Sequence, residues 1–212
     1  MTDIIWIMQR IYQILHSAKY KLNRLKDIVH TKVRLAGNGV QYKGYRIVGL
    51  PYISVCGGGR IVLGDGLEMN NGMLGNQIGY SNPCVLRAED GGSILIGKHV
   101  GMSQTTLVAK GADITIGDNV KLGGGVKIYT TDFHCMDFLK RRNTKLDMTE
   151  RRYASVMIGD DCFIGAGVII LKGVTIGARC IIGAGSVVTK DVAADSIAAG
   201  NPAKVIRQTW EE

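Results

Sequence analysis

The chain has 212 residues with 29 Gly, only 3 Pro and a formal net charge of +8. This much glycine is unusual for an ordinary α/β domain, and the lack of a three-residue glycine period excludes collagen. Five cysteines without a Cys-x-x-Cys pair argue against a disulfide framework and a zinc site, and they favour a reducing compartment.

Residues 1–45 read as an amphipathic helix followed by a linker. Apolar residues recur from Ile4 to Val29 in alternating steps of four and three, which predicts a helix with one apolar face. The first 34 residues carry seven Lys and Arg against Asp3 and Asp27, or +5 of the total charge. Two interpretations stay open. The helix docks on its own domain or on a neighbouring subunit, which we favour, or it lies on an acidic membrane surface.

Polar residues at Asp3, Gln9, Arg10 and Gln13 interrupt the apolar run of this segment. We therefore expect neither a signal peptide nor a membrane-spanning helix, and we expect a cytoplasmic protein. Peripheral contact with the inner membrane face is expected only under the second interpretation of the helix. Nucleic acid is not expected as a partner, because the positive charge lies on an amphipathic helix without a recognition motif.

Residues 46–200 carry a six-residue repeat that is clearest near the C-terminal end. An aliphatic residue occupies every sixth position there: Ile158, Ile164, Ile170, Ile176, Ile182 and Val188. A period of six fits neither a helix nor simple alternation, and hexapeptide repeats specify a parallel β-helix, an all-β solenoid. Cys162 and Cys180, three hexads apart, are expected to stack as small apolar fillers. Between Leu67 and Arg87 the period is poor, which predicts irregular coils or a loop.

The repeat is interrupted once at length, over about residues 131–157, and long loops in compact folds are often functional. His134 is a candidate general base because imidazole titrates near neutral pH. Asp132, two residues earlier on an extended chain, would face the same side and orient the ring. The alternatives are a loop histidine without a role and a solvated aspartate. Cys135 would face the opposite way, which argues against a Cys–His nucleophile.

The remaining histidines, His16, His30 and His99, do not form a set of three ligands, so no metal is expected. At the other end of the chain, Gly200 and Pro202 mark a turn, and a short helix is expected within residues 201–212. Lys204 and Arg207 would share a face of that helix and could bind phosphate groups together with Lys190. A solvated basic terminus is the alternative.

Three segments, Thr131–His134, Ile182–Asp191 and Gly200–Arg207, together with the hexads, resemble the hexapeptide-repeat acyltransferases. This left-handed β-helix family includes maltose, galactoside, capsular and lipopolysaccharide O-acetyltransferases. The resemblance implies a left-handed coil, a homotrimer with active sites between subunits, and acetyl-CoA as donor.

Carried over by position, the resemblance makes His134 the general base and Ser103 a binder of the acceptor or of the tetrahedral intermediate. Phe163 replaces the Trp that the sugar enzymes often carry. The resemblance also implies CoA contacts with the backbone amides of Ala166 and Ala184, with Thr189 and Lys190, and with the phosphate-binding side chains of Lys204 and Arg207.

The expected reaction is direct acetyl transfer, in a ternary complex, to a hydroxyl of a saccharide or of a surface-polysaccharide precursor. N-acetylation of an amino sugar, amino acid or antibiotic is an alternative. A non-catalytic structural β-helix subunit is an alternative of a different class.

Overall fold

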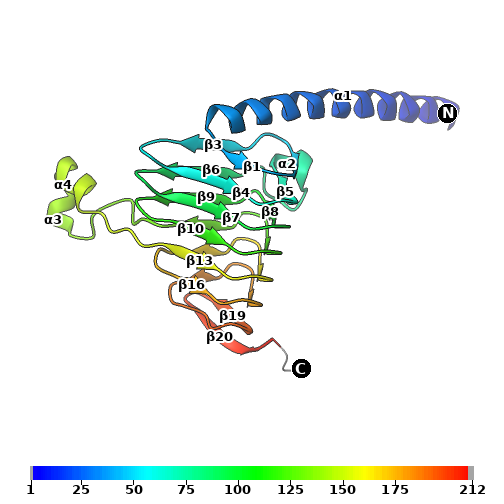
Figure 1. Cartoon of the computed structure of the whole chain (residues 1–212). Coiled ribbons are helices and arrows are strands. Elements are labelled where there is room, and N and C mark those ends of the chain that lie inside the picture. Colours follow the sequence, from blue (N-terminus) through cyan, green and yellow to red (C-terminus); the bar gives the residue numbers. More distant parts are fainter. Residues whose placement is uncertain (1, 210–212) are drawn as a thin grey trace.

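The computed structural model describes residues 2–209 and shows one long helix followed by a three-sided stack of strands (Figure 1). Each side of the stack is one sheet, named here A, B and C. Sheet A contains β1 (Gln41–Tyr42), β4 (Arg60–Leu63), β7 (Ser93–Ile96), β10 (Ile114–Ile116), β13 (Val156–Ile158) and β16 (Thr175–Ile176). Sheet B contains β2 (Tyr45–Val48), β5 (Leu67–Asn70), β8 (Gly101–Ser103), β11 (Lys121–Leu122), β14 (Phe163–Ile164), β17 (Ile181–Ile182), β19 (Ser196–Gly200) and β20 (Ala203–Gln208). Sheet C contains β3 (Tyr52–Val55), β6 (Val85–Glu89), β9 (Thr106–Lys110), β12 (Lys127–Tyr129), β15 (Ile169–Ile170) and β18 (Val187–Val188).

Up to β18, neighbouring strands in each sheet pair in parallel and are three strands apart in chain order. The chain therefore passes through A, B and C once in every coil, which confirms the parallel β-sheets that the hexad period predicted. Corners of successive coils lie above one another, so residues at equivalent hexad positions form columns along the stack.

The hexad residues are buried because they point into the interior of the coil. Ile164, Ile170, Ile176 and Ile182 are all fully buried, and each is paired in register with the residue at the same hexad position of a neighbouring coil. Burying a side chain of this size stabilises the fold by about 1.5–3 kcal/mol. Since a single coil cannot enclose these residues, stability depends on stacking.

Glycine follows the aliphatic residue where the next coil passes too closely for a side chain. A Cβ at Gly159 would lie 2.6 Å from the backbone nitrogen of Ala178, and one at Gly165 would lie 2.6 Å from that of Ala184. These distances are well inside van der Waals contact, so the corner tolerates only glycine without rearrangement.

Cys162 and Cys180 are buried in neighbouring coils, as expected for small apolar fillers. The Phe163 backbone nitrogen, next to Cys162, donates to the Cys180 carbonyl at 2.9 Å. Burial raises the pKa of the Cys162 thiol to about 11, so this thiol stays protonated and unreactive near neutral pH.

The irregular segment expected between Leu67 and Arg87 is a loop over residues 71–84 that contains α2 (Gly72–Gly75). Asn71 holds its two ends together. Its side-chain nitrogen donates to the Val48 carbonyl at 3.0 Å, and its side-chain oxygen accepts from the Cys84 backbone nitrogen at 2.7 Å. The loop therefore projects from the corner between sheets B and C as a fixed structure.

The N-terminal helix is present and longer than the apolar pattern indicated. α1 spans Thr2–Gly37, lies across the first coil and extends far beyond it (Figure 1). Only its last turns dock, through buried Thr31 and Leu35 and through Arg34, which donates to the Pro51 carbonyl. Docking on its own domain is thus limited to the C-terminal end of α1. Within residues 2–209, no helix has the length and apolar character that crossing a bilayer requires.

The prediction of a short C-terminal helix within residues 201–212 is wrong for the described part of that segment. Residues 203–208 form β20, which pairs antiparallel with β19, while residues 210–212 lie outside the described residues. After the turn at Gly200–Pro202, the edge of sheet B offers unpaired backbone groups that a strand can satisfy, whereas a helix of one or two turns is marginal in water. Lys204 and Arg207 therefore lie along a strand, opposite Ala199 and Ile197.

Replacing Ile170 by Ala should lower the free energy of unfolding by about 2–5 kcal/mol, because it leaves a cavity in the stacked interior. The neighbouring Ile169, on the same strand but only half-buried, provides the matched control. We expect Ile169→Ala to cost clearly less in urea unfolding followed by circular dichroism. Equal losses for the two variants would contradict the assignment of the interior column.

Candidate functional site

The long interruption of the repeat forms an excursion that leaves the solenoid after β12 and returns at β13 (Figure 1). Its two ends are joined in a neck. Thr131 and Tyr153 form an antiparallel bridge, and the Ala154 backbone nitrogen donates to the Thr130 carbonyl at 3.0 Å. The buried hydroxyl of Thr130 accepts from the Lys110 backbone nitrogen at 2.8 Å. The neck thus attaches the excursion firmly to the corner between sheets C and A.

Beyond the neck, two short capped helices form the head of the excursion. α3 (Phe138–Arg141) begins after Asp137, whose carboxylate accepts from the Leu139 backbone nitrogen at 2.8 Å. α4 (Thr144–Thr149) begins after Asn143, whose side chain accepts from the Lys145 and Leu146 nitrogens. Such caps satisfy backbone donors that a helix leaves free at its start. They stabilise helices that would be too short to form alone.

His134 lies in this head and is held by Asp147 of α4. The His134 Nδ1 atom is 2.8 Å from Asp147 Oδ2, and the other carboxylate oxygen accepts from the Cys135 backbone nitrogen at 2.7 Å. When Nδ1 carries the proton and donates to the carboxylate, Nε2 is left as an acceptor. The ring is 67% exposed and open to an incoming molecule. The arrangement is that of an oriented general base.

The hydrogen bond from His134, followed by the one from the Cys135 backbone, holds the pKa of Asp147 below its usual value. Because the pKa of Asp147 is lower in the folded state, its hydrogen bonds stabilise the fold at pH values above the ordinary carboxyl range. This stabilisation is lost only as the pH falls through the lowered pKa. Asp147 is therefore an ionised carboxylate at neutral pH.

Asp132 does not orient His134, and this expectation is corrected. Its Oδ1 atom accepts from Lys172 Nζ at 2.8 Å, which ties the neck to the next coil. The physical reason is Phe133, whose φ of +61° interrupts the extended chain on which the expected alternation depended. Asp147 was missed because it lies thirteen residues beyond His134, on α4, and the chain between them is irregular. The Asn143 cap could have indicated α4, but nothing in the spacing indicated its approach to the ring.

The residues expected at the donor and acceptor sites lie at two different corners. Ala166 and Ala184 occupy the corner between B and C in adjacent coils, where the Gly185 nitrogen donates to the Ala166 carbonyl at 2.8 Å. Ser103 lies higher in the same column but is buried beneath the loop 71–84, and its hydroxyl accepts from the Asn76 side chain at 3.1 Å. Lys204 is opposite Ala199, which packs on Gly183 beside Ala184.

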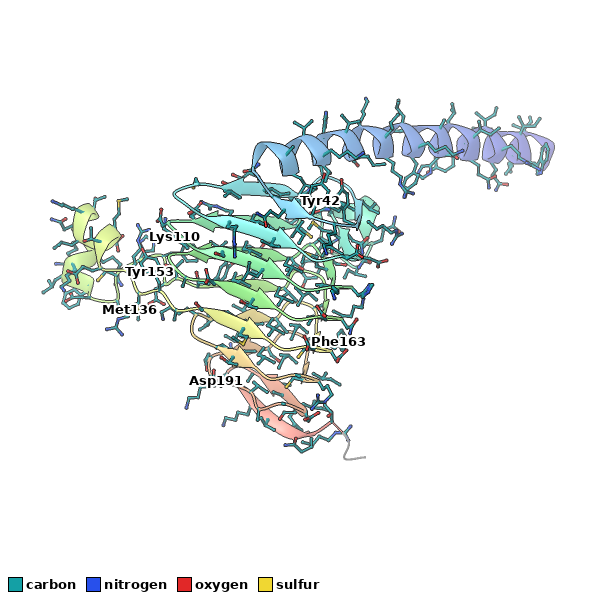
Figure 2. All side chains as sticks on the ribbon, in the orientation of Figure 1. Tyr42, Lys110, Met136, Tyr153, Phe163 and Asp191 are labelled. Carbon is teal, nitrogen blue, oxygen red and sulfur yellow. The ribbon has the colours of Figure 1, made fainter. Side chains whose placement is uncertain are left out.

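Thr189 and Lys190 are exposed at the other corner, between C and A, where Lys172 and the neck of the excursion also lie. Figure 1 shows α3 and α4 on the opposite side of the stack from α2, which belongs to the corner between B and C. In Figure 2, Met136 and Tyr153 likewise lie on the side of the excursion, and Phe163 of sheet B lies on the opposite side. One copy of the chain therefore does not bring His134 to the Ala166–Ala184 corner.

Comparison with known proteins identifies the repeat and its relatives. Residues 155–190 match the family model described as bacterial transferase hexapeptide (six repeats). Nodulation protein L of Rhizobium leguminosarum bv. viciae is 44% identical over 148 residues, which cover 68% of this chain and 75% of that protein. The match to a relative from Saccharomyces cerevisiae covers 59% of its length, so this chain spans less than two thirds of that protein.

Two solved structures share the architecture over most of both chains. A hexapeptide-repeat acetyltransferase from Vibrio cholerae, complexed with acetyl-CoA, is 27% identical, covers 92% of this chain and 91% of its own, and has a TM-score of 0.52. A maltose O-acetyltransferase from Clostridium difficile 630 is 25% identical, with coverages of 91% and 89% and a TM-score of 0.51. The chain thus belongs to the hexapeptide-repeat acyltransferases.

Proposed function

We propose that the chain transfers the acetyl group of acetyl-CoA to a hydroxyl of a saccharide or of a surface-polysaccharide precursor. The observation that carries this proposal is the His134–Asp147 pair on the excursion, a base held in one orientation and exposed to solvent. The similarity to a maltose O-acetyltransferase supports a saccharide hydroxyl as acceptor.

A hydroxyl is a weak nucleophile, so the reaction requires a base at the attacking oxygen. In the proposed mechanism, His134 Nε2 takes the hydroxyl proton as the oxygen attacks the thioester carbonyl. The tetrahedral intermediate then collapses with cleavage of the C–S bond, and the imidazolium returns its proton to the CoA thiolate. The products are an acetyl ester and CoA. Asp147 balances the positive charge that the ring carries between the two proton transfers.

The transfer is direct, without an acyl-enzyme. Cys135 is the nearest thiol in sequence to the base, but it is buried and its backbone is bound to Asp147. A nucleophile that forms a covalent intermediate must reach the substrate and be activated by the base. A backbone amide donor at the oxyanion would lower the barrier by about 3 kcal/mol.

Donor binding is proposed at the corner between B and C. Ala166 and Ala184 are accessible there, and the exposed cations Lys204 and Arg207 on β20 would meet the CoA phosphates as charge-assisted partners. Thr189 and Lys190, at the corner between C and A, are the remaining CoA-contacting residues that the family resemblance implies. Ser103 would take part in acceptor binding only through rearrangement of its bond with Asn76.

Because His134 and the Ala166–Ala184 corner lie on different sides of one chain, we propose a homotrimer of left-handed coils in which neighbouring copies complete each site. The head of the excursion supports such a contact. Five of its large apolar side chains are exposed in the single chain: Met136, Phe138, Leu139, Leu146 and Met148. An apolar surface of this kind marks an interaction site, and the solenoid of a neighbouring copy is the proposed occupant.

Replacing His134 by Ala should lower turnover by a factor of about 10²–10⁴, because general-base catalysis is lost. Turnover is measured as free thiol released from acetyl-CoA in the presence of oligosaccharides, nucleotide sugars and amino sugars. CoA should still raise the thermal unfolding midpoint of the variant, since a ligand of the folded state stabilises it. Near-normal turnover would refute the role of His134, and transfer confined to amines would replace O-acetylation by N-acetylation.

Asp147 is proposed as a positioning residue, so Asp147→Ala should reduce kcat while leaving the KM for acetyl-CoA unchanged. The amide hydrogen of Cys135 should also exchange faster in this variant, because its acceptor is gone. Glu150→Ala is the matched control, since Glu150 lies in the same head but pairs only with Lys140 at the surface. Unchanged kcat in Asp147→Ala, or an equal loss in Glu150→Ala, would contradict the assignment.

A further inference from the structure

The exposed face of α1 is a continuous apolar stripe. Apolar side chains recur along it every three or four residues, with the small Ala18 between Leu15 and Leu22. The large ones are all exposed: Ile4, Met8, Ile11, Leu15, Leu22, Leu25, Val29 and Val33. At a rise of 1.5 Å per residue, the stripe from Ile4 to Val33 is about 45 Å long. An unpartnered apolar face of this length marks an interaction surface.

The stripe points away from the rest of the molecule. Residues two apart on a helix lie about 200° apart around its axis. Thr31 and Leu35 face the solenoid, with 1% and 0% of their surface exposed. Val29, two residues before Thr31, is 52% exposed, and Val33, between Thr31 and Leu35, is 64% exposed. Because α1 lies across the end of the coil stack (Figure 1), its outward side forms one end of the molecule.

Lysines border the stripe on both edges. With 100° between consecutive residues, Lys19 and Lys26 fall on one edge, and Lys21 and Lys32 fall on the other. Asp27, the only acidic residue in the second half of α1, lies on the half-buried side that faces the solenoid. The rim of the stripe is thus uniformly cationic over this half of the helix.

These charges distinguish between two occupants. In a parallel coiled coil with a second copy of α1, residues in the flanking positions would place Lys21 against Lys26 of its partner, a repulsive pair. An anionic lipid surface satisfies both features, because lysines at the rim reach headgroup phosphates while the stripe enters the acyl boundary.

We propose that α1 lies flat on an anionic lipid bilayer, with its apolar stripe in the membrane interface and the solenoid on the side away from the lipid. The helix binds parallel to the surface. The contact is independent of acetyl transfer, since it uses no residue of the His134 head or of the Ala166–Ala184 corner.

The test is co-sedimentation of the full chain with phosphatidylcholine vesicles, with and without phosphatidylglycerol. The chain should pellet with the anionic vesicles, and binding should weaken at high salt because the lysine contribution is screened. Leu15→Glu on the stripe should lower partitioning by a factor of about ten or more. Gln13→Glu, which makes the same charge change on the opposite side of the exposed helix, should lower it much less.

Three outcomes would overturn the proposal. They are no sedimentation with anionic vesicles, equal binding to neutral and anionic vesicles, and equal losses for Leu15→Glu and Gln13→Glu. Light scattering without lipid measures the oligomeric state. If Leu15→Glu changes that state while the wild-type chain does not bind vesicles, the stripe is an interface between protein chains instead.

Discussion

The structure depends on the stacking of aliphatic side chains inside the coil. Each hexad places one such residue inward, and the cavity it fills is closed only by the coils above and below. Glycines at the corners allow this close approach, as the 2.6 Å gap between a Cβ at Gly165 and the Ala184 nitrogen shows. The interior therefore fixes the register of every coil, and the register decides which distant residues become neighbours.

Additions to such a stack are accommodated at its corners, where they leave the strand ladders intact. The loop 71–84 leaves at the corner between B and C, and the His134 excursion leaves at the corner between C and A. Buried polar side chains, Asn71 and Thr130, anchor them, so both hold defined positions relative to the stack. The chemistry of the molecule follows from this placement. The proposed base lies at one corner and the proposed donor-binding column at another, and this separation is the reason for proposing that two copies of the chain share each site.

The sequence allowed the solenoid to be predicted because six-residue spacing is a local property that the folded coil preserves. The aliphatic residues from Ile158 to Val188 lie where the period places them, and so do Cys162 and Cys180, which are stacked in neighbouring coils. The excursion was also predicted, as the place where that period is interrupted.

Contacts that depend on irregular backbone were not predicted. The left-handed conformation of Phe133 separates Asp132 from His134, and α4 brings Asp147 to the ring from thirteen residues away. The C-terminal strand was missed because an open sheet edge outweighs the weak helical tendency of a few residues. The part of α1 that meets the solenoid was likewise not visible in the helical pattern, which describes only the apolar face.

In the proposed trimer, neighbouring copies complete each catalytic site. The most direct measurement is acetyl transfer by mixed oligomers, prepared by coexpressing two differently tagged variants and purifying through both tags. One variant carries His134→Ala and the other carries Lys204→Glu with Arg207→Glu. We expect that each variant alone is inactive and that the mixed oligomer regains activity, because some interfaces then combine an intact base with an intact donor site. Mixed oligomers as inactive as the separate variants would show that His134 and the β20 cations serve the same chain, and would contradict the shared site.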